Sequence, residues 1–221
     1  MHIEPGLVDG TKIALSYATA AAAGTYTLKT AYEAIRAQGV GSLVARSVIA
    51  AAAVFTFFEV FPHAAVGVSE VHLILGSTLF LILGAAPAAI GLALGLLIQG
   101  VFFAPFDLPQ YGMNVTTLLV PLFGLQVLAK RLIAPGTAYV DLRYGQALAL
   151  STAYQGGIVA WVAFWAIYGQ GFSAASSIAT FGVAYMSVIL IEPLVDLAVL
   201  AVAKRIRGLQ GSALVTPRLF A

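Results

Sequence analysis

Apolar residues occur along this chain in seven long stretches, not in the alternating pattern that strands produce. The stretches are residues 12–29, 43–61, 71–84, 87–103, 113–132, 145–169 and 175–203. Most approach the roughly 20 residues that a helix needs to cross the bilayer core, whereas the strands of a membrane barrel would alternate apolar and polar residues. Gly84 and Pro87 divide one run into two helices joined by a tight turn. The pattern predicts an all-α integral membrane protein, a bundle of about seven transmembrane helices.

Composition excludes a water-soluble fold. Of the 221 residues, 61% are hydrophobic and 9% are charged, against about 25% charged in soluble domains. Seven spans leave no room for a separate soluble domain, so residues 1–221 are expected to form a single transmembrane domain. Its parts are a leader or plug at 1–10, the helix bundle at 11–203 and a tail at 204–221. The formal charge of +2 gives no basis for a nucleic-acid partner, and without cysteines any metal must be held by nitrogen or oxygen.

Basic residues follow alternate stretches, which predicts an orientation in the bilayer. They are Lys29 and Arg36 after the first, Lys130, Arg131 and Arg143 after the fifth, and Lys204, Arg205, Arg207 and Arg218 after the seventh. The loops after the second, fourth and sixth stretches have no Lys or Arg. Because cytoplasmic loops retain these residues, the N-terminus is expected outside and the C-terminus in the cytoplasm, in a multi-pass protein of the cytoplasmic (inner) membrane.

The first stretch has a second interpretation, as a secretory signal peptide. Lys12 precedes an apolar run that ends at Gly24, and cleavage there would remove the leader. The acidic residues Glu4 and Asp9 before the run, and the loss of one span from the topology, count against cleavage.

Few ionisable residues fall at membrane depth, where each costs about 2.5–3.5 kcal/mol on insertion scales. Glu192 lies deep in the last stretch beside Pro193, and Asp196 lies one turn further on the same face. Glu192 either accepts hydrogen bonds from a neighbouring helix or handles an ion, and the two carboxylates form a possible intramembrane polar pair that shares a proton or a cation. Arg46 and Glu59 lie near the ends of their stretch and are expected to reach an interface.

His2 offers unusual metal chemistry. The amine of Met1, the backbone nitrogen between Met1 and His2, and one imidazole nitrogen of His2 can close fused five- and six-membered rings around one cation. His72, expected to open the third helix at the exterior side, could supply a fourth nitrogen. A planar nitrogen set suits Ni(II) or Cu(II), with Co(II) also possible. The alternative is a disordered terminus in which His2 has no role.

Three blocks of sequence carry a family resemblance. They are Met1-His2-Ile3-Glu4-Pro5-Gly6, then Val71-His72-Leu73-Ile74-Leu75-Gly76 continuing through Leu83-Gly84 and Pro87 to Gln99, and finally Gly112-Met113-Asn114 with Ile191-Glu192 in the last stretch. Together they resemble the CbiM/NikM family, the substrate-binding membrane component of cobalt and nickel energy-coupling factor transporters. Three departures stand out: Glu4-Pro5-Gly6 inserts a proline into the leader, the loop around Asp107 lacks a glycine pair expected after the aspartate, and Asp196 stands where a small or hydroxyl residue is expected.

The resemblance implies specific roles. Met1, His2 and His72 would be the metal ligands, with the leader tucked into the bundle as a plug, and Asn114 and Gln99 would line or support the site. The protein would capture Co(II) or Ni(II) from the exterior as its transported substrate, with no organic cofactor and no enzymatic activity. A transmembrane coupling subunit and two ATPase subunits would drive transport, since this chain has no phosphate-binding glycine-lysine loop.

Two other classes of function remain open. One is a non-transporting structural subunit of a larger membrane assembly that retains the family fold. The other is a haem- or pigment-binding membrane protein with His72 as an axial ligand. Purified protein that binds metal stoichiometrically, and loses it when His2 is replaced, would argue against a structural subunit. A purified protein without colour would exclude a haem- or pigment-binding protein.

Overall fold

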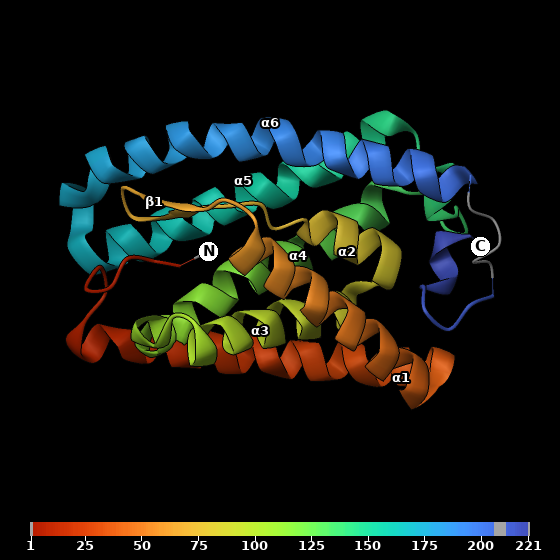
Figure 1. Cartoon of the computed structure of the whole chain (residues 1–221), viewed down its shortest axis with the longest axis horizontal. Helices are drawn as coiled ribbons and strands as arrows, with labels where there is room; N and C mark the ends of the chain where they lie inside the picture. The colour runs from red at the N-terminus through yellow and green to blue at the C-terminus, as the bar shows by residue number, and fades with distance from the viewer. Residues whose placement is uncertain (1, 206–210, 221) are drawn as a thin grey trace.

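The structure, a computed structural model, describes residues 2–205 and 211–220. Its long helices lie roughly along the longest axis of the molecule (Figure 1). The helices are α1 (Ala14–Phe55), α2 (Gly76–Leu83), α3 (Ala85–Phe102), α4 (Tyr111–Leu132), α5 (Tyr144–Gln170) and α6 (Ala175–Arg205). The short strands β1 (Ala64–Val66) and β2 (Ser69–Val71) form an antiparallel hairpin. Short helical turns are η1 (Gly10–Ile13), η2 (Thr56–Val60), η3 (Pro105–Gln110), η4 (Tyr139–Asp141), η5 (Gly171–Ala174) and η7 (Pro217–Leu219).

The helices have the length and apolarity of membrane spans, which confirms the predicted class of all-α integral membrane protein. Four continuous helical stretches within the described residues are long and apolar enough to cross a membrane. They cover residues 10–60, 85–102, 105–132 and 144–205. The last of them contains both α5 and α6. The count of seven spans and the orientation of the termini stay predictions.

The predicted loop between the first two stretches is wrong. Residues 30–38 continue the helix, and α1 bends only at Gly39, whose backbone adopts φ 81° and ψ 164°. Because Ala, Glu, Arg and Gln are good helix formers, the polarity around Glu33 and Arg36 does not end the helix, whereas glycine adopts a positive φ without steric cost. In Figure 1 the two arms of α1 turn at the same end of the molecule as the C-terminus.

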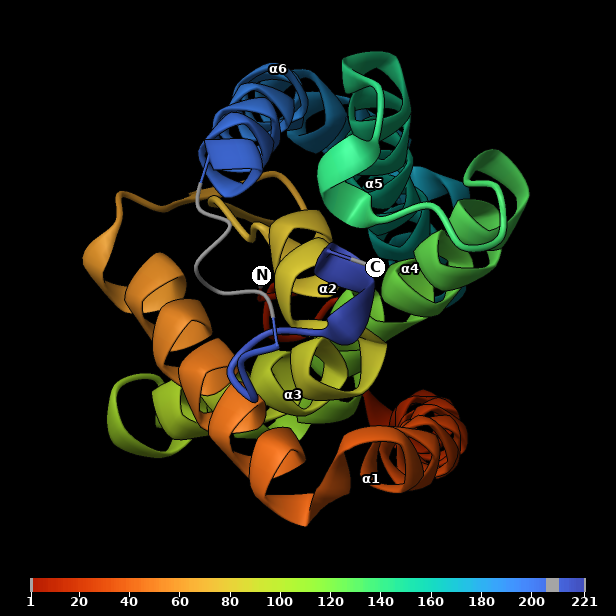
Figure 2. The same ribbon diagram turned by 90° about the vertical axis from the view of Figure 1, so that its right-hand side faces the viewer.

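The third predicted stretch, residues 71–84, forms a helix that is shorter than a membrane span. α2 has only eight residues, Gly76–Leu83, which is about 12 Å at about 1.5 Å per residue and too short for a core of about 30 Å. The end-on view shows α2 in the middle, surrounded by the other helices (Figure 2). His72 therefore does not open a helix, because the residues before α2 form β2 and an extended connection.

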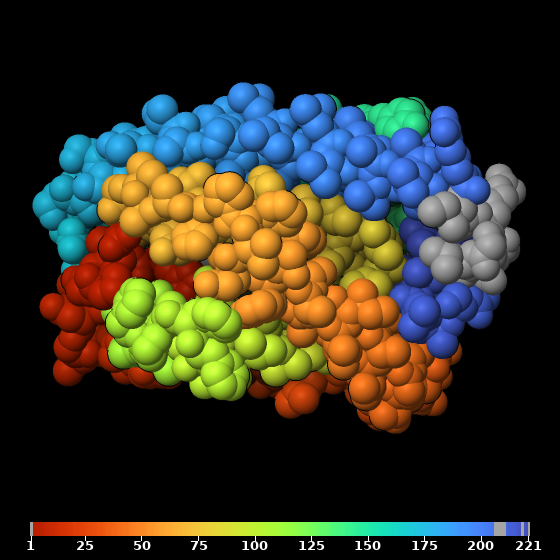
Figure 3. Space-filling model, in the orientation of Figure 1, coloured from red at the N-terminus to blue at the C-terminus, as the bar shows by residue number. Residues whose placement is uncertain are grey.

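The hairpin that replaces the start of that span draws the chain's beginning into the sheet. Ala65 pairs with Glu70 inside the hairpin, and Ile3 forms an antiparallel bridge with Ser69 on the other edge of β2. In the space-filling view the hairpin lies directly beside α6, which is coloured blue (Figure 3). Three-residue strands have no apolar periodicity long enough to predict them from sequence.

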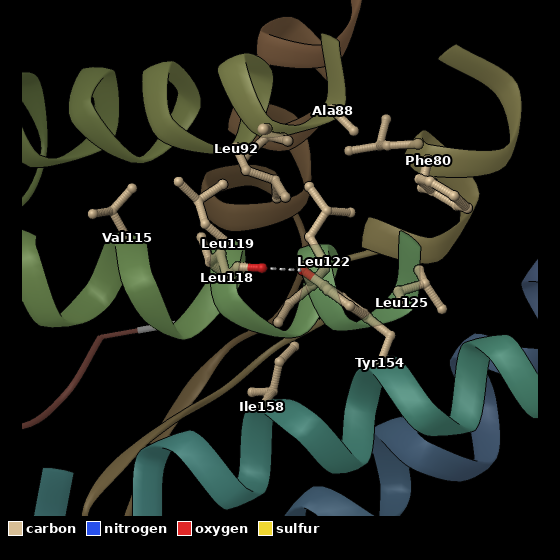
Figure 4. Close-up of a cluster of buried hydrophobic side chains, with 14 of the residues drawn as sticks. Phe80, Ala88, Leu92, Val115, Leu118, Leu119, Leu122, Leu125, Tyr154 and Ile158 are labelled. Atoms are coloured by element: carbon tan, nitrogen blue, oxygen red, sulfur yellow. Dashed lines mark hydrogen bonds between the residues drawn. The ribbon is translucent and has the colours of Figure 1, made fainter. Parts of the chain in front are cut away.

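The core packs α4 between two sets of helices. Leu118, Leu122 and Leu125 of α4 are buried with side chains from α2, α3 and α5 (Figure 4). Tyr154 of α5 is fully buried in this cluster, and its hydroxyl donates to the carbonyl oxygen of Leu118 at 3.3 Å. Because a membrane solvates apolar side chains as well as the protein interior does, such close packing and hydrogen bonding hold the helices together.

Small residues set the contact between the second arm of α1 and α3. A Cβ built on Gly91 would clash with the Cβ of Ala50 and lie 2.8 Å from the carbonyl carbon of that residue. A Cβ on Gly95 would lie 2.6 Å from Cγ1 of Val54. These glycines let the two backbones approach closely, as in the small-xxx-small motifs of membrane helices.

Replacing Gly91 by alanine should therefore destabilise the fold. We expect Gly91→Ala to lower the free energy of unfolding by about 1–3 kcal/mol, the usual cost of overpacking a tight contact. The matched control is Gly124→Ala in α4, where a Cβ meets nothing within 4 Å and the better helix propensity of alanine adds stability. Thermal unfolding of both variants in the same detergent measures the difference, and equal stability would contradict close α1–α3 packing.

Candidate metal centre

Residues 2–4 lie inside the bundle, paired with β2. The amide of Glu70 donates to the carbonyl oxygen of His2 at 3.0 Å, and the hydroxyl of Ser69 donates to the same oxygen at 2.8 Å. The amide of Glu4 donates to the carbonyl oxygen of Val68 at 3.2 Å. This pairing satisfies the polar main chain of the leader and leaves His2 only 4% exposed.

Contacts with α4 and α5 hold the rest of the leader. The amide of Ile3 donates to Oδ1 of Asn114 at 2.8 Å, and the Ile3 side chain is fully buried. Lys12 donates to the carbonyl oxygen of Gly169 at 2.7 Å. A Cβ on Gly169 would clash with the carbonyl oxygen of Leu7, so glycine is needed where the leader crosses the end of α5.

The imidazole of His2 is held by a hydrogen bond at Nε2, whereas Nδ1 lies close to a carboxylate but forms no hydrogen bond within the described residues. Nε2 lies 2.8 Å from Oε1 of Gln99, and Nδ1 lies 2.8 Å from a carboxylate oxygen of Asp107. The amide nitrogen of Gln99 donates to the carbonyl oxygen of Phe58 at 3.3 Å and to Glu59 at 3.2 Å, which fixes the orientation of the amide. Gln99 therefore accepts the Nε2 proton of His2, and Nδ1 faces Asp107.

His72 lies in the connection between β2 and α2 and is 3% exposed. Its ring packs edge-on against Phe58 with the ring centroids 4.6 Å apart. Nε2 of His72 is buried and has no hydrogen-bond partner among the described residues. The backbone carbonyl of Phe58 accepts a hydrogen bond from Gln99, the partner of His2, so Phe58 links the surroundings of the two histidines. A buried nitrogen without a partner is costly unless a ligand or water meets it.

Carboxylates gather around His2. Glu70 lies 4.0 Å from Nε2 of His2, and Asp107 contacts the opposite side of the ring. Burial raises the pKa of Glu4, the neighbouring carboxylates of Glu70 and Asp107 raise it further, and His2 offsets part of the rise. Several acidic groups close together in a partly buried place favour a cation among them.

The predicted ligand set is described only in part. His2 and His72 are placed as above, whereas Met1 lies outside the described residues, as does the basic residue Arg207 of the tail. Across residues 2–205 and 211–220, no group of three or more His, Cys, Asp or Glu side chains could by itself hold a metal ion. A centre here would therefore need main-chain nitrogen in addition to the two imidazoles.

Glu192 lies in α6 and bonds to the segment that carries His72. One carboxylate oxygen accepts hydrogen bonds from the amides of Ile74 and Leu75, the latter at 3.0 Å. The other oxygen accepts from the side-chain amide of Gln155, which in turn accepts from the hydroxyl of Tyr185 at 2.7 Å. Leu75 has a left-handed backbone with φ 53°, so Glu192 holds a strained position three residues after His72.

Asp196 uses a different set of donors one turn further along α6. Its two carboxylate oxygens accept from the hydroxyls of Ser77 and Thr78 at the start of α2. Both Glu192 and Asp196 are buried, but within the described chain no hydrogen bond joins either of them to His2 or His72. Both carboxylates therefore fasten α6 to α2 and to the connection before it.

Sequence reasoning missed three features of this region. Asp107 was noted only as a loop residue, and nothing local connects it to His2, which lies far away in the sequence. Glu59 was assigned to an interface, but it contacts Gln99. Arg46, also expected at an interface, is 2% exposed, and its guanidinium donates to the carbonyl oxygen of Leu83 at 2.6 Å. The expectation for Arg46 was wrong because the kink at Gly39 and the tail bury that end of α1.

Comparison with known proteins bears on the identity of the chain. The family model for CbiM, the cobalt uptake substrate-specific transmembrane region, matches residues 2–209. No curated protein matches the sequence. A solved structure described as a truncated transition metal transporter is similar in fold, with a TM-score of 0.66 and 17% sequence identity, covering 93% of this chain and 97% of that one. Because the family model spans nearly the entire sequence, this multi-pass membrane protein belongs to the CbiM family of cobalt uptake substrate-specific transmembrane regions.

Proposed function

We propose that this protein captures Co(II) or Ni(II) from the exterior and serves as the substrate-specific component of an energy-coupling factor transporter. The observation that carries the proposal is the pair of buried histidines: His2 is drawn inside by its pairing with β2, and His72, whose ring packs against Phe58, keeps an unpartnered Nε2. Membership in a metal uptake family and a fold like that of a transition metal transporter support it.

The proposed ligands are four nitrogen atoms. The amine of Met1, the backbone nitrogen and Nδ1 of His2, and Nε2 of His72 would form a planar set suited to Ni(II) and also available to Co(II). Gln99 supports this assignment, because by accepting the Nε2 proton of His2 it leaves Nδ1 to the metal. Asp107 would then balance the charge of the ion, and Asn114 would fix the leader through the amide of Ile3.

The arrangement of the two ends supports the proposed orientation. Residues 1–10 would act as an exterior plug on the bundle of residues 11–203, and residues 204–221 would form a cytoplasmic tail. The tail packs at the kink of α1, where Ser42 donates to the carbonyl oxygen of Ala213 at 2.8 Å. Lys29 and Arg36 lie in the first arm of α1 before the kink, and Lys130 and Arg131 lie in the last turn of α4. The positive-inside rule expects such residues at a cytoplasmic face. A transmembrane coupling subunit and two ATPase subunits would supply the energy for transport.

A one-residue extension tests the proposed site. Placing a single alanine before Met1 keeps every side chain but moves the terminal amine out of the chelate, so we expect tight Ni(II) and Co(II) binding to be lost. Metal analysis and calorimetric titration of the purified protein measure this. His2→Ala and His72→Ala should lose binding as well.

The control for these variants is His63→Ala, because His63 is exposed and lies outside the site. It should bind metal as the wild type does. Full binding by the extended protein would show that the terminal amine is not a ligand. No binding by the wild type would favour a non-transporting structural subunit.

Metal uptake should also release protons. Ligation by the backbone nitrogen displaces the amide proton, and the amine and imidazoles bind only when deprotonated, so affinity must fall as the pH falls. Calorimetry of Ni(II) binding in two buffers with different heats of ionisation counts the protons released. We expect at least one per ion, and an observed heat that does not depend on the buffer would contradict ligation through the backbone nitrogen.

Glu192 is proposed to position His72. Its carboxylate accepts both amides that directly follow the His72–Leu73 segment, and no other group in the described chain is recorded as accepting from them. Glu192→Leu would leave two buried N–H groups unsatisfied, at about 1–3 kcal/mol each. Since metal binding needs His72 held in place, we expect Ni(II) affinity to fall on the order of tenfold.

Two variants separate positioning from a general loss of structure. Glu192→Gln keeps an acceptor oxygen and should retain more affinity than Glu192→Leu, while Ser187→Ala on the exposed side of α6 should change nothing. Titrations are compared at temperatures at which circular dichroism shows every variant folded. A folded Glu192→Leu protein with wild-type affinity would rule out the positioning role.

A further inference from the structure

Arg46 is a buried cation without a counterion. It is 2% exposed, its Nε donates to the carbonyl oxygen of Ser42 at 3.3 Å, and its Nη1 donates to that of Leu83. Nη2 has no hydrogen-bond partner, and no carboxylate forms an ion pair with the guanidinium in the described part of the chain. Buried charges are costly unless they are paired, so this one calls for an anionic partner.

A cavity of about 300 Å³ lies beside Arg46. Its wall includes Thr30 from the first arm of α1, Arg46 from the second arm, Gln126 from α4 and Thr216 from the tail. The rest of the wall comes from the start of α3, residues 84–87, from Pro217, and from further residues of the first arm of α1, among them Glu33 and Gln38. Segments from α1, α3, α4 and the tail therefore border one space at the kinked end of the bundle.

The start of α3 adds a second attraction for negative charge. The first N–H groups of an α-helix have no partner within the helix, and the helix dipole makes this end positive. α3 has 18 residues and begins after Gly84, whose φ of 93° favours glycine. A Cβ on Gly84 would lie 3.5 Å from Nη1 of Arg46, so this helix start and the guanidinium adjoin each other.

The surrounding charges also favour an anion. An adjoining cavity of about 160 Å³ shares Gly84, Ala85, Gln126 and Thr216 with the first and is lined by Lys130. Glu33 is the acidic residue on the wall of the larger cavity, but it is exposed and forms no recorded ion pair with Arg46. Arg46 and a helix start therefore face this space against one exposed carboxylate, and Lys130 adds a second cation at the adjoining cavity.

We propose that this cavity binds a phosphate-type oxyanion, either the headgroup of an anionic phospholipid or inorganic phosphate. A phosphate group offers several acceptor oxygens, which match the unpartnered Nη2 of Arg46, the N–H groups of Ala85 and Ala86 at the start of α3, and the hydroxyl of Thr216. The site lies at the end of the bundle to which the basic residues assign the cytoplasmic face, where anionic headgroups gather. It is separate from the proposed metal centre and does not depend on it.

Ligand-dependent stability of the full-length wild-type protein tests the proposal. Delipidated protein in neutral detergent is heated with inorganic phosphate or with chloride at equal ionic strength, and separately in nanodiscs of phosphatidylglycerol or of phosphatidylcholine. We expect a melting temperature that is higher in phosphate than in chloride, higher in phosphatidylglycerol than in phosphatidylcholine, or both. The rise should be a few degrees at ligand concentrations well above Kd. A response to the lipid alone identifies a headgroup site, and a response to phosphate as well identifies a site open to the free ion.

The matched variants are Arg46→Gln and Arg131→Gln. The first removes a positive charge from the cavity, and the second removes one from an exposed position on α4. Arg46→Gln should lower the affinity for the stabilising ligand at least tenfold, measured by native mass spectrometry, and Arg131→Gln should leave it near the wild-type value. Equal melting temperatures of the wild type in all media would overturn the proposal, even if Arg46→Gln does not fold. Equal ligand affinity in a folded Arg46→Gln protein would overturn it as well.

Discussion

The pairing of the leader with β2 is the interaction on which the proposed site depends. A polar main chain cannot enter a membrane bundle unless its N–H and C=O groups find partners. Here Glu70 and Ser69 satisfy the carbonyl oxygen of His2, and Asn114 satisfies the amide of Ile3. Without these bonds the first residues would remain in water, and His2 would be separated from the connection that carries His72.

The shortness of α2 makes that pairing possible. A full transmembrane helix in its place would consume its own backbone donors and leave no strand edge for the leader. Because α2 begins only at Gly76, residues 64–75 form the hairpin and an extended connection, whose free amides must be satisfied inside the bundle. Glu192 accepts two of them, and Asp196 fastens the start of α2 through Ser77 and Thr78. The buried carboxylates of α6 thus satisfy the donors of the irregular segment that positions His72 and of the helix start that follows it.

Sequence predicted the parts of this fold that depend on local pattern. α3, α4, α5 and α6 begin and end within a few residues of the expected stretches, because a membrane helix is continuously apolar and its ends are marked by polar or glycine residues. The hairpin could not be predicted, since three-residue strands are specified by partners distant in sequence. The contact of His2 with Asp107 is equally non-local, and the placement of His72 near His2 was a hypothesis from ligand chemistry that the family resemblance strengthened.

The distribution of charge limits how an ion could leave the proposed site. Carboxylates of Glu4, Glu70 and Asp107 surround His2, which favours retention of a cation at that end. Further inside, Glu192 and Asp196 already accept hydrogen bonds from main-chain and hydroxyl donors, so a cation moving inward would have to displace them. At the opposite end the buried charge of Arg46 repels cations. Under the proposed function, release of the metal ion therefore requires the leader or the bundle to rearrange. The proposed coupling and ATPase subunits would supply the energy for that rearrangement.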